Sequence, residues 1–180
     1  MPAANAVQRP KELVQIVDED NKALGKATRA EMRAGNLIHR CSFAVVENSQ
    51  GQLYVQKRVA FKETFPSHYD PAPGGVVGYG ESYEDNAVRE LEEEMGITGA
   101  CLETLFDFWY SDNTCRLWGR LFRCKSDGPF TLDPEEVETG SFMSLQEVVQ
   151  LLENGPVCPD SAIAVQRYLQ EQHPELLQDS

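Results

Sequence analysis

The sequence predicts an α/β fold in which strands and helices alternate along the chain and pack as a sandwich. Strand-like runs are interleaved with amphipathic helical stretches, which is the pattern of α/β domains. The chain has 180 residues, enough for one domain with a substantial core and short for two. It contains no internal repeat and no convincing linker. We therefore expect residues 11–180 to form a single domain after a flexible start at residues 1–10.

The strand-like segments are separated by turn-forming residues. In each segment the apolar residues alternate with polar ones or form a short run. We predict strands at residues 12–17, 24–27, 41–47, 53–57, 75–77, 102–109, 116–123 and 141–143. The first two would form an N-terminal hairpin. Residues 61–74 contain three prolines and no periodicity, which predicts an ordered loop.

Helices are predicted where capping residues precede an amphipathic stretch. Capping-box spacing occurs at three places: Thr28 with Glu31, Ser82 with Asp85 as an Asp variant, and Ser144 with Glu147. The predicted helices cover residues 28–34, 82–95 and 144–154, and a last one runs from Asp160 or Ser161 to Gln172.

The helix at residues 82–95 carries two adjacent stripes. At about 100° per residue its apolar side chains gather on one stripe. Glu90, Glu93 and Glu94 gather on the next, because residues three and four apart are neighbours on a helix. Gly96 follows where a left-handed C-cap is expected. Three neighbouring carboxylates repel one another unless a cation offsets the charge, and oxygen-only ligands favour Mg²⁺ or Mn²⁺. A solvated acidic face is the alternative for a glutamate run alone.

Charge and cysteine content narrow the class of protein. The formal net charge is −13, which opposes non-specific binding to nucleic acid or to an anionic membrane. The five cysteines are scattered and include no CxxC pair, so we expect free thiols in a reducing compartment. No signal-peptide pattern and no bilayer-length apolar run is present. We expect a cytoplasmic protein without nucleic-acid or membrane partners, and a homodimer is the common default.

Residues 75–97, GVVGYGESYEDNAVRELEEEMGI, resemble the Nudix box at every defining position. Gly75 is followed after five residues by Glu81 and after seven more by the run that begins at Arg89. The resemblance implies a mixed central sheet between helices. It also implies divalent-metal-dependent hydrolysis of a phosphoanhydride bond, in a nucleoside diphosphate linked to another moiety or in a similar small-molecule diphosphate. Residues 37–40 and the TFP-containing loop further resemble the branch that includes isopentenyl-diphosphate isomerase and, more closely, bacterial hydrolases of the YfcD type.

The resemblance assigns roles to the box residues. Glu90, Glu93 and Glu94 match the glutamates that bind the catalytic cation, Mg²⁺ or Mn²⁺, and Glu93 and Glu94 are also expected to act in catalysis. Arg89 matches the arginine that orients a glutamate through a charge-assisted bond. Glu81 would contribute through a water or only bond to the loop backbone.

Gly74 and Gly75 are expected to form the phosphate-binding loop together with Glu81. Glycine suits such a loop because it permits a positive φ and lets phosphate approach the backbone closely. An ordinary turn is the alternative for two glycines alone.

The general base of the reaction is expected outside the box, because the resemblance places it in a loop after the later strands. Glu135, Glu136 and Glu138 are the candidates there. Glu136 is preferred because it directly precedes Val137, ahead of a strand-like segment. A box glutamate is the alternative base, and surface solvation is the alternative for each loop acid.

Two other functions compete with hydrolysis. An isomerase of isopentenyl diphosphate would need a catalytic cysteine before the box, where this chain has residues 70–74, DPAPG, and a glutamate after a tryptophan, where Trp118 is followed by Gly119. A nucleotide-binding module without turnover commonly has an eroded box, whereas this box is complete. Nucleotide sugars, dinucleotides, nucleoside triphosphates and isoprenoid diphosphates all remain open as substrates.

Overall fold

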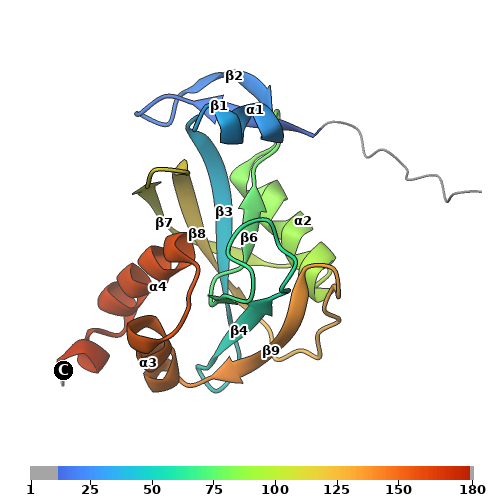
Figure 1. Ribbon diagram of the computed structural model, residues 1–180. Helices are drawn as coiled ribbons and strands as arrows, with labels where there is room; N and C mark the ends of the chain where they lie inside the picture. Colours follow the sequence, from blue (N-terminus) through green and yellow to red (C-terminus); the bar gives the residue numbers. More distant parts are fainter. Residues whose placement is uncertain (1–11, 179–180) are drawn as a thin grey trace, which may run out of the picture.

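The computed structural model describes residues 12–178, so the flexible start expected at residues 1–10 lies outside the described part. Figure 1 shows a curled sheet with α2 on one side and α3 and α4 on the other. The helices are α1 (Arg29–Ala34), α2 (Tyr83–Met95), α3 (Leu145–Asn154) and α4 (Pro159–Gln172), followed by the 3-10 turn η1 (Pro174–Leu177). The strands are β1 (Leu13–Val17), β2 (Ala23–Thr28), β3 (His39–Glu47), β4 (Leu53–Arg58), β5 (Tyr69–Asp70), β6 (Gly74–Val76), β7 (Leu102–Ser111), β8 (Arg116–Lys125) and β9 (Val137–Met143). The predicted α/β/α sandwich with a mixed sheet and an N-terminal hairpin is confirmed.

Strand β3 is the centre of the sheet. It pairs in parallel with β8 along its whole length and antiparallel with β6, β4 and β1. Strand β7 extends the β8 side, whereas β5 and β9 both pair with β4. The short strand β6 pairs with residues 41–43 of β3. This pairing brings the start of the Nudix-like segment against the middle of the sheet.

Each face of the sheet has its own apolar cluster. The cluster under α2 contains Ala87, Leu91 and Met95 of that helix, packed against residues of β3 and β8. The cluster on the opposite face joins α3 and α4 to the other side of β3. Burial of its apolar stripe fixes the rotation of α2, and this rotation decides where the glutamates of α2 lie.

No helix within residues 12–178 is both long and apolar enough to cross a membrane.

Two strands differ most from the prediction, while the others shift by one or two residues. Strand β9 begins at Val137 and not at residue 141, because its pairing with β4 extends back to Arg58 and stabilises a stretch with little strand propensity of its own. Residues Tyr69–Asp70 form β5 inside the segment predicted as a loop, again by pairing with β4. Pairing with a distant strand overrides the local pattern in both cases.

The last helix also begins earlier than predicted. Its N-cap is Cys158, which makes no side-chain capping bond, and Pro159 is the first helical residue. Proline suits that position because its φ is already helical and it has no N–H to leave unpaired. The predicted capping boxes at Thr28 and Ser144 are both present.

Candidate active site

Both ends of α2 are capped as its sequence predicts. The Ser82 side chain accepts a hydrogen bond from the backbone N–H of Asp85 at 3.0 Å. At the other end Gly96 is left-handed, with φ 70°, and its N–H bonds to the carbonyl oxygen of Glu92. The caps satisfy backbone groups that a helix end otherwise leaves unpaired. They therefore hold the glutamates of the last two turns on a fixed frame.

Glu90 lies directly over Gly75 of β6. A Cβ atom added to Gly75 would come within 2.5 Å of the carboxyl carbon and of Oε1 of Glu90. A Cβ atom on Gly74 would come within 1.7 Å of the carbonyl oxygen of Ser42 in β3. Neither glycine has a left-handed φ, so the predicted positive φ is wrong, and both residues lie in a strand and not in a loop. These glycines are needed because β6 is packed closely between β3 and the Glu90 carboxylate.

Arg89 connects the acidic residues on the outer side of α2. Its Nε and Nη2 donate to the two carboxylate oxygens of Glu81, at 2.9 and 3.2 Å. Its Nη1 contacts Glu90 and Glu93, each at 3.3 Å. The Glu93 side chain is 56% exposed and the Glu90 side chain 13%. Arg89 therefore offsets charge on the solvent side, while Glu90 points inward.

The Glu81 carboxylate is held by several donors. Besides Arg89, it accepts hydrogen bonds from the backbone N–H of Gly78 at 2.9 Å and from the Asn86 amide at 3.0 Å. Burial alone would raise the pKa of Glu81, but the bonds from Arg89, Gly78 and Asn86 outweigh it and lower the pKa. Of the two roles expected for Glu81, this geometry favours bonding to the loop backbone.

Glu90 and Glu94 are two partly buried carboxylates one helical turn apart. Burial raises the pKa of Glu90 to about 7, although the Arg89 charge opposes the shift. The pKa of Glu94 is raised well above its ordinary value, first by burial and then by repulsion from Glu90, Asp70 and Glu136. Burial is the largest cause of both shifts, and neither the 3.3 Å contact of Arg89 with Glu90 nor the Lys62 charge near Glu94 offsets it.

The three candidate bases after the later strands have different surroundings. Glu135 is exposed, and Glu138 pairs with Lys57 at 3.5 Å. Glu136 forms an ion pair with Lys62 and is 35% exposed. It also belongs to the loop whose Asp133 N–H bonds to the carbonyl oxygen of Glu94 at 3.0 Å. Glu136 contributes to the repulsion that raises the pKa of Glu94.

Asn86 and Asp70 join the site although the sequence analysis did not select them. Asn86 is buried, bonds to Ser42 through its oxygen and donates to the carbonyl oxygen of Val76 at 3.0 Å. Its signal in the sequence is its position four residues before Glu90, on the same face of the helix. Asp70 is buried in β5 and accepts a bond from Ser161 at 2.7 Å, which no local pattern predicts.

The donor set of this face fits a hard divalent cation. Its inward groups are carboxylate oxygens, which Mg²⁺ and Mn²⁺ prefer. Within residues 12–178, no three His, Cys, Asp or Glu side chains are already arranged as a cage for a metal ion. Mg²⁺ does not need one, because it keeps several waters and takes further ligands from substrate phosphates. Glu90 and Glu94 are the residues of this face that could hold it.

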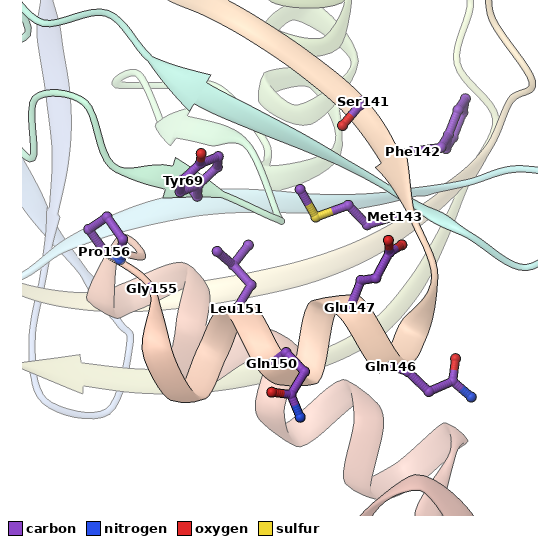
Figure 2. Close-up of a pocket in the computed structure, with 10 residues that line it drawn as sticks. All are labelled: Tyr69, Ser141, Phe142, Met143, Gln146, Glu147, Gln150, Leu151, Gly155 and Pro156. Carbon is purple, nitrogen blue, oxygen red and sulfur yellow. The ribbon is translucent and has the colours of Figure 1, made fainter.

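A separate groove of about 520 Å³ lies between β9, α3 and Tyr69. Figure 2 shows Tyr69, Met143 and Leu151 around it. None of the box residues lines this groove, so it is distinct from the carboxylate face of α2.

Comparison with known proteins shows to which family the chain belongs. The family model of the NUDIX domain matches residues 37–165. The chain belongs to the Nudix family. An uncharacterised Nudix hydrolase of Yersinia pestis is 39% identical over 158 residues, covering 88% of this chain and 86% of the relative. The Escherichia coli Nudix hydrolase YfcD is 39% identical over 137 residues, covering 76% of each chain.

A solved structure shares the fold of this chain. The crystal structure of DR0079 from Deinococcus radiodurans superposes with a TM-score of 0.75 at 26% identity, covering 87% of this chain and 98% of the other. The expected membership of the Nudix family, with resemblance to the YfcD type, is therefore confirmed, and the chain is a Nudix-family hydrolase.

Proposed function

We propose that this Nudix hydrolase cleaves a phosphoanhydride bond in a nucleoside diphosphate linked to another moiety, or in a similar small-molecule diphosphate, with Mg²⁺ or Mn²⁺. The observation that carries the proposal is the pair Glu90 and Glu94. These partly buried carboxylates lie one turn apart, Glu90 directly over Gly75 of β6, and burial raises the pKa of both. Such desolvated acids are expected where a divalent cation replaces the lost hydration.

When bound, the cation would neutralise charge on the phosphate oxygens and lower the pKa of a bound water. Glu90 and Glu94 would hold it from the inner side of α2, and Glu93 would join them on leaving Arg89. Arg89 would keep the box acids oriented. Glu136 would accept a proton from the attacking water, as a general base beside Glu94.

The strand β6 would supply the surface that the diphosphate approaches. Gly74 and Gly75 present backbone without side chains there, next to the Glu90 carboxylate. Glu81 would hold the following loop through its bond to the N–H of Gly78.

The proposal also extends to the setting of the enzyme. Residues 11–180 would act as one catalytic unit on a small-molecule diphosphate, without nucleic-acid or membrane partners. The free thiols of all five cysteines suit the reducing cytoplasm. A homodimer is proposed on the general frequency of that state alone.

The substitution Glu94→Gln tests the proposal, because it keeps the shape of the side chain and removes the charge. We expect metal-dependent release of phosphate or mononucleotide, measured on a panel of diphosphates with Mg²⁺ and with Mn²⁺, to fall by about 100-fold or more. The unfolding midpoint in urea should stay the same or rise, since a desolvated carboxylate is removed. Full activity of the variant would show that Glu94 does not hold a catalytic cation.

A further inference from the structure

The segment between β4 and β5 forms ion pairs with neighbouring elements on two sides. Figure 1 shows this segment, residues 59–68, within the loop that follows β4. On one side Glu63 pairs with Arg33 of α1, and on the other Lys62 pairs with Glu136 before β9. The segment contains Phe65 and Ser67 with φ of 48° and 59°, conformations that non-glycine residues seldom adopt. Such strained residues are concentrated at ligand-binding sites.

A short chain of hydrogen bonds places Lys62 beside the inner face of α2. The N–H of Asp133 bonds to the carbonyl oxygen of Glu94 at 3.0 Å, and the N–H of Glu136 bonds to the carbonyl oxygen of Asp133 at 3.1 Å. The Glu136 carboxylate then meets the Lys62 ammonium. This chain of bonds links the Lys62 ammonium to the last turn of α2, which carries Glu94.

The Lys62–Glu136 pair is not required to hold the segment in place. Arg58 already fixes it through bonds to the Thr64 carbonyl oxygen at 3.0 and 3.2 Å and to its hydroxyl at 3.2 Å. The N–H of Val59 bonds to the Glu136 carbonyl oxygen at 3.3 Å. A partly exposed ion pair of this kind adds little stability. The Lys62 side chain, 24% exposed, is thus free to exchange its partner.

We propose that Lys62 binds the diphosphate of the substrate, exchanging its ion pair with Glu136 for a phosphate oxygen and releasing Glu136 to act as the base. This inference rests on the proposed function. A lysine ammonium is a compact charge that suits phosphate. In the hydrolysis, the water oxygen bonds to phosphorus and a water proton passes to Glu136 and then to solvent. The bridging P–O bond breaks, and its electron pair leaves with the departing phosphate.

The test is binding of imidodiphosphate, a diphosphate analogue with a stable P–N–P bridge, measured by calorimetry with Mg²⁺. Lys62→Gln should weaken binding by about 10- to 100-fold, the size expected for a lost bond to a charged group, and Lys62→Arg should restore most of it. The matched control is Lys57→Gln, since Lys57 also pairs with a glutamate near β9, Glu138, and is 30% exposed. Binding by this control should stay within about twofold of the wild type.

Substitution of Glu136, the ion-pair partner of Lys62, should have the opposite effect on imidodiphosphate binding. Glu136→Gln removes the same ion pair but leaves Lys62 free for phosphate. It should keep or tighten imidodiphosphate binding while turnover of a diphosphate substrate falls by about 100-fold or more. Should Lys62→Gln fail to fold, this variant decides: weaker imidodiphosphate binding by Glu136→Gln would overturn the exchange.

The outcomes separate this inference from the proposed function. Wild-type binding that Lys62→Gln leaves unchanged overturns the role of Lys62 alone, because the diphosphate site is then present without it. Absence of imidodiphosphate binding by the wild type, together with absence of turnover, overturns both.

Discussion

The contact between Gly75 and Glu90 can be perturbed by a single methyl group. In Gly75→Ala the new Cβ atom would meet Oε1 and the carboxyl carbon of Glu90 at 2.5 Å, whereas ordinary contact begins at 3.4 Å. The carboxylate must therefore retreat from 2.5 to 3.4 Å, a displacement of about 0.9 Å, and errors of this size in a catalytic group can cost about 100-fold in rate. Gly75→Ala should reduce kcat by about that factor and weaken Mn²⁺ binding.

The fold should tolerate the change. The atoms displaced belong to the end of a flexible side chain and not to the backbone, so we expect the overpacking cost to lie near the lower end of its usual range, about 1 kcal/mol. Urea denaturation measures this cost, calorimetry with Mn²⁺ measures the affinity, and a diphosphate panel measures kcat. Wild-type Mn²⁺ affinity and turnover in Gly75→Ala would refute the reasoning, since Glu90 would then not need its position.

Alanine substitutions at two other glycines, Gly25 and Gly74, serve as comparisons for Gly75→Ala. Gly25→Ala in β2 adds a methyl group with no atom within 4 Å and without a left-handed φ, so it should change neither stability nor metal binding. Gly74→Ala would place its Cβ 1.7 Å from the Ser42 carbonyl oxygen, and the backbone cannot yield as a side chain does. It should disrupt the β3–β6 pairing and unfold much of the protein. A graded response, from Gly25 through Gly75 to Gly74, is the expected pattern in the urea midpoints.

Two further predictions concern stability. Ser82→Ala removes the side-chain bond to the Asp85 N–H and should lower the free energy of unfolding by about 1 kcal/mol, measured in urea, with no change if the cap is dispensable. Burial and then repulsion from Asp70 raise the pKa of Asp160 to about 6, above the value of roughly 3.9 for an unfolded aspartate. The neutral form therefore fits the fold, and its stabilising contribution is lost as pH rises from about 4 to about 6. Asp160→Asn should exceed the wild type in unfolding free energy at pH 7 and match it near pH 4, and an equal difference at both pH values would contradict this.

The parts of the site that the sequence predicts are those encoded within one helix. The Ser82 cap, the Gly96 C-cap and the separation of apolar from acidic stripes follow from residues at most a few turns apart. The carboxylate stripe itself divides in the folded protein, because rotation of α2 on its core turns Glu90 inward and leaves Glu93 exposed. That rotation depends on packing against β3 and β8.

Other features depend on residues far apart in the chain. Lys62 and Glu136 are 74 positions apart and meet only because β9 pairs with β4. The same pairing moves the start of β9 back to residue 137. The sequence likewise does not show why residue 75 must be glycine, because the Glu90 side chain approaches it only in the folded protein. Local patterns predict elements, whereas partners across the sheet require the fold.

The position of Arg89 explains how a face with so many acids stays folded and still leaves a place for a cation. Its guanidinium pairs with Glu81 and Glu93 on the outer side and has only one 3.3 Å contact with Glu90. The described residues show no side-chain bond between Arg89 and Glu94, and the Lys62 charge opposes the rise of the Glu94 pKa. Arg89 and Lys62 therefore offset only part of the charge of the inner pair. A ligand that binds only the folded state stabilises that state. A divalent cation on Glu90 and Glu94 would thus complete both the catalytic face and the electrostatic balance of the fold.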